Sequence, residues 1–254
     1  MPRMETREVV LTNRHGKRMP ATYRIVENAK GTFVLLHGIG GWKDQRVMRA
    51  LIDPVVESGY SVVTFDAADG ANAPDANSLT GTPTGYLEDL EDVIARIREE
   101  SWYQAPLSLG GHSLGALMAV RYAAEHPDEV AKLVLAAPGL SWKTYQHLVP
   151  VGLWWTLRGK VRMPGPELRH YWIGKPWLFD FLSFDGLKYA SNVRAKTLVV
   201  MGAKDGLVGT LRTHRKYAAA FQNATFKAIK GASHTFHPHE ETLTATIKEW
   251  LTSS

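Results

Sequence analysis

A glycine-flanked serine, Gly111-His112-Ser113-Leu114-Gly115, is the feature that most constrains how this chain can fold. Residues 106–109 before it are strand-like, and residues 116–124 after it are rich in helix-forming side chains. A strand that passes into a helix at a serine needs a tight turn, and side chains in place of the two glycines would collide with the neighbouring strand and helix. The turn also puts the serine where free helix N–H groups favour negative charge. Ser113 is therefore predicted to be a nucleophile whose hydroxyl stands clear of the sheet.

Strand-like and helix-like segments alternate along most of the chain, which predicts an α/β fold with a mostly parallel sheet between helices. An N-terminal hairpin is expected around residues 13–16. Apolar runs predict buried strands at residues 32–37, 61–65, 131–137, 195–201 and 225–229. Apolar residues at helical spacing predict helices at residues 44–58, from Thr82-Pro83 onward, and at 208–221 and 240–252. The core is assigned to residues 1–138 and 191–254.

Two of the predicted helices contain residues that bear on where the helix begins, bends or ends. Pro54 lies inside the helix expected at residues 44–58, so a kink or a break is predicted there. Thr82 and Pro83 are suited to the cap and first turn of the next helix. The acids that follow suit a helix N-terminus and are predicted to be structural: Glu88, Asp89, Glu91 and Asp92.

A serine nucleophile needs a base, and the base needs an orienting acid. Asp205 follows the strand that ends near residue 201, and His234 follows the strand that ends at Ile229. Both fall at the carboxyl ends of predicted strands, where open α/β sheets place their sites. Asp205 could instead be a turn residue, and His237 and His239 are local rivals of His234. A His-x-His pair with no further evident ligand does not predict a metal site.

The oxyanion formed during acyl transfer needs two hydrogen-bond donors. The backbone N–H of Leu114, directly after the nucleophile, is predicted to be one of them. The second is expected from the loop His37-Gly38-Ile39-Gly40-Gly41, which follows a buried strand, and we assign it to the N–H of Ile39. His37 is interpreted as a residue that braces this loop rather than as a catalytic base.

Four motifs follow one another along the chain: the loop at 37–41, the elbow at 111–115, Asp205 and His234. With these motifs in this order the chain resembles the α/β-hydrolase superfamily and in particular its small capped serine esterases and lipases. Residues 86–94 are also similar to the helix before the elbow strand in bacterial carboxylesterases and cinnamoyl-ester hydrolases. The resemblance covers the chain outside residues 139–190. It implies a Ser113-Asp205-His234 triad, an acyl-enzyme, and no cofactor or metal. The segment after Asp66 departs from the pattern of relatives, so the shape of the loop at 67–82 is not predicted.

Residues 139–190 interrupt the alternation where this superfamily carries its cap, and we expect a small helical cap insertion there. Five of the chain's eight tryptophans lie in this segment. Their enrichment predicts a pocket for bulky, aromatic or medium-chain substrates. The candidate substrate-binding residues are Trp142, Trp154, Trp155 and Trp172.

Composition and charge argue against a membrane-spanning protein and against a nucleic-acid-binding protein. The 254 residues contain no run of about 18 apolar residues, no apolar leader and no cysteine, which predicts no transmembrane segment and fits a cytoplasmic protein. The net charge of +5 is modest, and no nucleic-acid-binding module is evident, so no nucleic-acid partner is expected. The oligomeric state is not fixed by the sequence, and a homodimer stays open.

The sequence thus predicts a serine hydrolase that cleaves small-molecule carboxylic esters. A carbon–carbon bond hydrolase, a lactonase or a peptidase would share the triad and differ only in the pocket. A cofactor-free haloperoxidase side reaction would share it too. A non-catalytic receptor on the same fold is a further alternative. The serine at the elbow excludes the dehalogenase and epoxide-hydrolase branches, which use an aspartate there.

Overall fold

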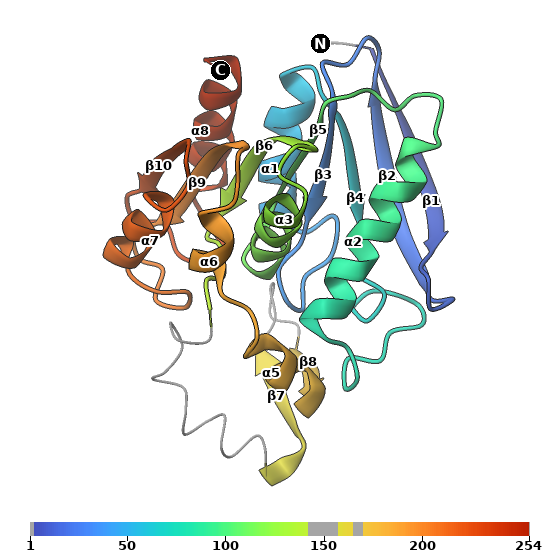
Figure 1. Ribbon diagram of the computed structural model, residues 1–254, viewed down its shortest axis with the longest axis vertical. Helices are drawn as coiled ribbons and strands as arrows, with labels where there is room; N and C mark the ends of the chain where they lie inside the picture. The colour runs from blue at the N-terminus through green and yellow to red at the C-terminus, as the bar shows by residue number, and fades with distance from the viewer. Residues whose placement is uncertain (1–2, 142–156, 165–169, 254) are drawn as a thin grey trace.

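A single twisted sheet of eight strands organises the computed structural model, which describes residues 3–141, 157–164 and 170–253 (Figure 1). The spatial order is β1-β2-β4-β3-β5-β6-β9-β10. The strands β1 and β2 pair antiparallel and β2 is antiparallel to β4, while the remaining neighbours are parallel. This confirms the predicted mostly parallel α/β sheet. The strands are β1 Met4–Thr12, β2 Arg18–Val26, β3 Thr32–Leu36, β4 Ser61–Phe65, β5 Leu107–His112, β6 Val130–Ala136, β9 Lys196–Gly202 and β10 Ala224–Ile229.

Helices cover both faces of this sheet. The alternation in β3 shows why: Phe33 and Leu35 pack into the cluster with α1 and α8, whereas Val34 and Leu36 pack into the cluster with α2, α3 and α7. A strand buried on both faces reads as a continuous apolar run, as residues 32–36 do. The helices are α1 Arg46–Glu57, α2 Pro83–Arg98, α3 Leu114–Glu125, α7 Leu211–Ala218 and α8 Glu240–Thr252.

The sequence predicts that Pro54 kinks or breaks its helix. The helix is not broken, because α1 continues through Pro54 to Glu57. Proline lacks the N–H that would bond to the carbonyl four residues earlier, which here belongs to Ala50. The hydroxyl of Thr244 on α8 donates to that carbonyl at 3.2 Å. The hydrogen-bond donor that the Ala50 carbonyl lacks within α1 is thus supplied by Thr244 of the neighbouring helix.

Helix α2 begins as expected but uses its acids differently. The Thr82 hydroxyl accepts the Gly85 N–H at 3.0 Å, and Pro83 occupies the first turn. No acid lies in that first turn. The four acids instead bind the turn between β1 and β2, so the interpretation as N-terminal charges is corrected, while their structural role stands. The pairs are His15–Glu88, Asn13–Asp89, Arg14–Glu91 and Arg14–Asp92.

Between β6 and β9 in the sequence, the described elements β7, β8 and α5 lie beyond the carboxyl ends of the parallel strands (Figure 1). The sequence predicts only short helices here, but a two-stranded antiparallel hairpin, β7 Lys160–Pro164 and β8 His170–Gly174, precedes α5 Lys175–Phe181 and α6 Gly186–Ala190. Asp180 accepts both the N–H and the hydroxyl of Thr84 at the start of α2. Phe184 belongs to the main core. Whether residues 139–190 form a separate cap stays a prediction.

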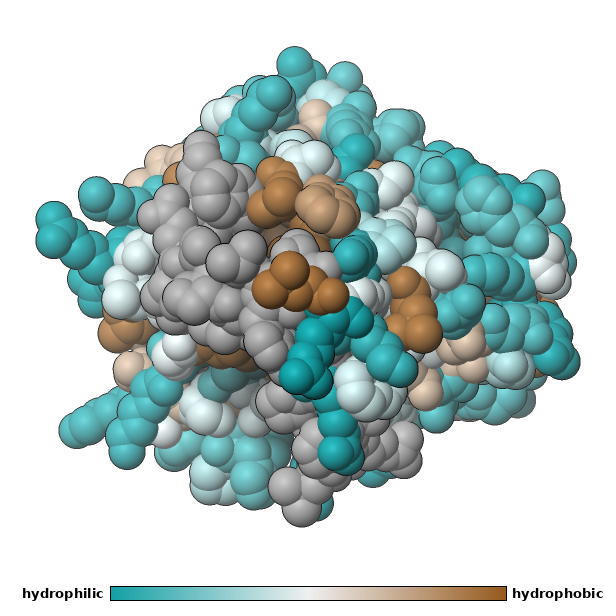
Figure 2. Space-filling view, turned by 90° about the horizontal axis from the view of Figure 1, so that it is seen from below, coloured by the Kyte–Doolittle hydropathy of each residue, from teal (hydrophilic) through white to brown (hydrophobic). Residues whose placement is uncertain are grey.

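Several exposed apolar side chains belong to this segment. Leu157 is 80% exposed, and Phe179, Trp172 and Leu182 are each at least 44% exposed. Figure 2, which views the molecule from below, shows hydrophobic residues set among hydrophilic ones on this face. Among the helices that the structure describes, none has the length and apolar character needed to span a bilayer.

The substitution Leu117→Ala tests how the end of the inserted segment is held. Leu117 on α3 is fully buried, and a Cβ built on Gly186 of α6 would lie 3.3 Å from its Cδ1. We expect a loss of about 3 kcal/mol in the free energy of unfolding, because the variant leaves a cavity between the two helices. Urea denaturation measures it. The control is Leu187→Ala on α6, which is 47% exposed and should cost less than about 0.5 kcal/mol. Equal losses in the two variants would contradict this packing.

Candidate active site

Ser113 lies between β5 and α3 on a strained turn, with φ of 54° and ψ of −115°. The two flanking glycines are required by close approach to β3. A Cβ on Gly111 would lie 2.6 Å from the carbonyl oxygen of Leu36, and one on Gly115 would lie 2.4 Å from the same oxygen. Positive φ at a non-glycine residue is costly and concentrates at functional sites. The local structure is therefore the strand–turn–helix geometry expected for a nucleophile elbow.

Asp205 and His234 are hydrogen-bonded, with 2.8 Å between Asp205 Oδ2 and His234 Nδ1. The other carboxylate oxygen accepts the N–H groups of Leu207 at 2.8 Å and Val208 at 3.3 Å. Burial raises the pKa of Asp205, but the hydrogen bond and charge of His234 and the two backbone donors outweigh it, so the pKa lies below its usual value. Asp205 is thus held as a carboxylate that orients the imidazole.

His112, which sequence reasoning did not single out, ties the His234 loop to the elbow. Its Nε2–H donates to the backbone oxygen of His234 at 2.9 Å, and the two ring centroids are 4.7 Å apart. Burial lowers the pKa of His112 to about 3, so the ring is neutral. The residue before Ser113 therefore positions the loop of the predicted base. The Ser113 hydroxyl itself has no hydrogen bond to His234 in the described structure.

The loop after β3 lies directly against Ser113, because a Cβ on Gly38 would be 3.2 Å from the Ser113 Cβ. His37 braces this loop. Its Nδ1–H donates to the Gly38 oxygen at 2.8 Å, and its Nε2 accepts the Ala67 N–H at 3.2 Å. The Tyr86 hydroxyl donates to the His37 oxygen at 3.1 Å. Both ring nitrogens are engaged, which agrees with a bracing role.

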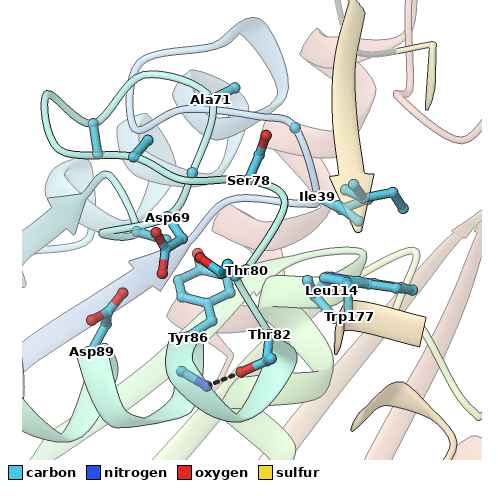
Figure 3. Close-up of a pocket in the computed structure, with 18 of the residues that line it drawn as sticks. Ile39, Asp69, Ala71, Ser78, Thr80, Thr82, Tyr86, Asp89, Leu114 and Trp177 are labelled. Atoms are coloured by element: carbon cyan, nitrogen blue, oxygen red, sulfur yellow. Dashed lines mark hydrogen bonds between the residues drawn. The ribbon is translucent and has the colours of Figure 1, made fainter. Parts of the chain in front are cut away.

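A cavity of about 600 Å³ opens beside the elbow, and Ile39 and Leu114 both line it (Figure 3). It is bounded by the loop after β3, by the loop at 67–82 and by β8 and α5. Ser113, Asp205 and His234 are not among the lining residues. The cavity instead reaches the elbow through Gly38 and Leu114.

Aromatic residues of the inserted segment form one wall of this cavity. Trp172 is the one predicted substrate-binding tryptophan that the structure describes, and it lines the cavity. Trp142, Trp154 and Trp155 lie outside the described residues. Tyr171 and Trp177 also line the cavity; they belong to the aromatic residues of 139–190 that are expected to form the pocket, although they are not among the four named candidates. Gly40, with φ of +66°, is needed under Tyr171, because a Cβ there would lie 2.0 Å from that ring. Alternation in the segment could have indicated β8, whereas nothing in the sequence distinguishes Trp177 from the other tryptophans.

The sheet order, the elbow and the flanking helices define the α/β-hydrolase fold. The sequence profile of the serine aminopeptidase S33 family matches residues 27–183, more than half of the chain. The chain belongs to this family. The structure is similar to that of Est1E from Butyrivibrio proteoclasticus with ferulic acid bound, with a TM-score of 0.79 and 16% identity over 96% of this chain and 98% of that one.

Two curated relatives share part of the sequence. A probable proline iminopeptidase of Streptomyces coelicolor is 31% identical over 108 residues, which cover 40% of this chain and 31% of the relative. A 2-hydroxy-6-oxononadienedioate/2-hydroxy-6-oxononatrienedioate hydrolase of Escherichia coli is 32% identical over 112 residues, 42% of this chain and 36% of the relative. The matched region thus spans about a third of the length of each relative.

Three buried histidines make the fold sensitive to acid. Burial lowers the pKa of His37, His112 and His214 from the usual value near 6.5. Below pH 6.5 each of these histidines therefore binds a proton more readily in the unfolded chain than in the folded protein, so its contribution to the free energy of unfolding falls as the pH falls. Each such histidine contributes a slope of up to about 1.4 kcal/mol per pH unit between that pH and its own folded pKa, which for His112 is about 3.

Denaturation at pH 7, 6, 5 and 4 measures this slope. We expect His112→Gln to lower the slope between pH 6 and 4 by up to about 1.4 kcal/mol per pH unit, the contribution of one proton, because one neutral buried ring is removed. The variant His214→Gln, which removes a second buried ring with a lowered pKa, should change the slope in the same direction. A slope unchanged in both variants would mean that these rings take up protons as easily in the folded protein as in the unfolded chain.

Proposed function

We propose that the protein is a serine hydrolase that cleaves carboxylic esters through an acyl-enzyme. The observation that carries this proposal is the Asp205–His234 hydrogen bond on a loop that His112 attaches to the strained turn of Ser113. A nucleophile, a base and an orienting acid are the minimum that acyl transfer by serine requires. Ester hydrolysis needs, besides these residues, only donors for the oxyanion and a water molecule.

In the proposed mechanism Ser113 Oγ attacks the ester carbonyl while His234 Nε2 takes its proton. Asp205 holds Nδ1, which leaves Nε2 as the ring nitrogen directed to the nucleophile, and its charge stabilises the imidazolium. The N–H groups of Ile39 and Leu114 bind the oxyanion. His234 then protonates the leaving alcohol, and a water molecule activated by the same ring releases the acid.

The proposed substrates are small esters with a bulky, aromatic or medium-chain group. The cavity beside Leu114 supports this, because Tyr171, Trp172 and Trp177 form an aromatic wall at its side. Est1E, whose structure holds ferulic acid, has the same fold and gives independent support for an aromatic ligand. Further substrate contacts from Trp142, Trp154 and Trp155 and a cap at residues 139–190 belong to the same proposal.

Carbon–carbon bond hydrolysis is the second candidate. The name of the Escherichia coli relative describes a hydrolase of a 2-hydroxy-6-oxo dioate, a compound with no ester or amide bond, so hydrolysis of it would break a carbon–carbon bond. Peptide hydrolysis is favoured by the family and by the Streptomyces coelicolor relative. All three reactions use one triad, so only the substrate separates them.

The first test is hydrolysis of p-nitrophenyl esters from C2 to C12 and of one hydroxycinnamate ester, with Ser113→Ala alongside. We expect kcat to fall by about 10⁴-fold or more in the variant, because the nucleophile is removed. Labelling of Ser113 by a fluorophosphonate provides the control. Labelling without ester turnover would move the assignment to a carbon–carbon, lactone or peptide substrate, and no labelling of folded protein would exclude the serine mechanism.

Asp205→Asn tests the orienting acid. An amide can donate to Nδ1 and so favour the wrong tautomer of His234, and we expect kcat on p-nitrophenyl acetate to fall by about 10³- to 10⁴-fold. The matched control is Asp128→Asn, at a side chain that is 80% exposed and paired with Arg194 far from the elbow. An Asp205→Asn rate within threefold of the control would rule out this role for the carboxylate.

A further inference from the structure

The cavity beside the elbow changes character along its length. Leu114 and Trp177 lie together on one side of Figure 3, near the loop after β3. Asp69 and Asp89 lie on the other side, and Thr80 lies between the two groups. A substrate that places its ester at Ser113 and extends into this space would have an apolar body and a polar far group.

The charges at the far end are mostly paired already. Lys17 Nζ lies 2.8 and 2.7 Å from the two carboxylate oxygens of Asp69, and Asp69 also accepts the Asn77 N–H at 2.9 Å. His15 Nε2 lies 3.0 Å from one oxygen of Glu88. The cation of Lys17 is therefore neutralised within the wall, and it presents no free positive charge to a ligand.

Asp89 adds a third carboxyl group to the same end. It is only 3% exposed, and it accepts hydrogen bonds from Asn13 at 2.7 Å and from the Ala68 N–H at 2.8 Å. Each carboxylate has about four acceptor positions, so these groups retain unused acceptor capacity. The far end of the cavity thus offers a ligand unused acceptor positions, while the charge of its lysine is already balanced.

Resting on the proposed function, we propose that this cavity selects esters whose far group is uncharged and carries a hydroxyl, and that the Lys17–Asp69 pair determines this selection by excluding carboxylates. A hydroxyl can donate to the spare carboxylate oxygens. A carboxylate would meet three acidic side chains and a lysine whose charge Asp69 already balances. Removing a charge from water without a free partner is costly.

The same reasoning separates this chain from one of its relatives. The name of the Escherichia coli hydrolase describes a dioate, a substrate with two carboxylates. A ligand of that kind, bound with its reacting carbon at Ser113, would carry its second carboxylate toward Asp69, Glu88 and Asp89. The far end of this cavity has the wrong charge for such a group.

The substitution Asp69→Asn reverses the selection and so tests it directly. The asparagine oxygen can still accept the Asn77 N–H, but the charge of Lys17 is no longer balanced. We expect the ratio of kcat/KM for hydroxyl-bearing over carboxylate-bearing esters to be at least about 10 in the unmodified protein and to fall about tenfold in the variant.

Two further variants control for indirect effects. The double variant Asp69→Asn/Lys17→Met has the same net charge at the pair as the unmodified protein, so its ratio should return toward the original value. Asp75→Asn removes an acid from the same loop, where Asp75 pairs with Arg18 and does not line the cavity. Its ratio should equal that of the unmodified protein.

The substrates are two matched series, because either half of the ester could occupy the cavity. One contains methyl 3-arylpropanoates with a hydroxyl, methyl or carboxylate group at the para position, and the other contains benzyl acetates with para hydroxymethyl, methyl or carboxylate groups. Products are quantified by chromatography at pH 7. A ratio near 1 in both series, or a ratio that Asp69→Asn leaves unchanged, would overturn the charge selection.

Failure of this inference can be distinguished from failure of the proposed function. Every variant is also assayed with p-nitrophenyl acetate, which carries neither a hydroxyl nor a carboxylate, and is labelled with a fluorophosphonate. If Ser113 labels and the acetate is hydrolysed, an unexpected ratio counts against the charge selection alone. If neither occurs in folded protein, the serine esterase assignment fails and the charge selection fails with it.

Discussion

The close approach of the elbow to the end of β3 is the constraint on which the site depends. The Leu36 carbonyl oxygen leaves no room for a Cβ at either Gly111 or Gly115. The turn can therefore sit against the neighbouring strand, which places the loop with Ile39 beside Ser113. The strain at Ser113 is maintained because β5 is hydrogen-bonded on both sides, to β3 and to β6. The parallel strands β9 and β10 bring the loops of Asp205 and His234 to the same edge of the sheet, where the two side chains are hydrogen-bonded.

Buried neutral histidines then connect loops that the sheet only brings near one another. His37 joins the loop after β3 to the loop after β4, by accepting the Ala67 N–H. His112 joins the elbow to the loop after β10, through the backbone of His234. His214 on α7 reaches the Pro138 oxygen after β6. A neutral imidazole suits this role because it has one N–H donor and one acceptor nitrogen, both of which His37 uses, provided that burial keeps the ring uncharged by lowering its pKa.

The sequence predicts the residues with strict backbone or periodic requirements and misses those set by tertiary packing. The elbow, the buried strands and the Thr82 cap have local causes, and each is found where the pattern indicates. The β7–β8 hairpin is missed because proline, glycine and aromatic residues obscure its alternation. The hydrogen bonds of Glu88 and Asp89 are missed because their partners, in the turn at residues 13–16, lie more than 70 positions away in the sequence. No local pattern reports such a contact.

Those distant contacts explain why motifs can indicate a mechanism class without indicating a substrate. The elbow, Asp205 and His234 come from the strand ends, whereas the far wall of the cavity comes from the β1–β2 turn, the acids of α2 and the loop at 67–82. That loop is where the sequence departs from the pattern of relatives after Asp66. Asp69 in that loop pairs with Lys17, which directly precedes β2. The polarity of the cavity therefore depends on how the antiparallel edge of the sheet packs against this loop and α2. In the proposed function, reaction chemistry and substrate selection thus come from different parts of the fold, and the second can change while the first is retained.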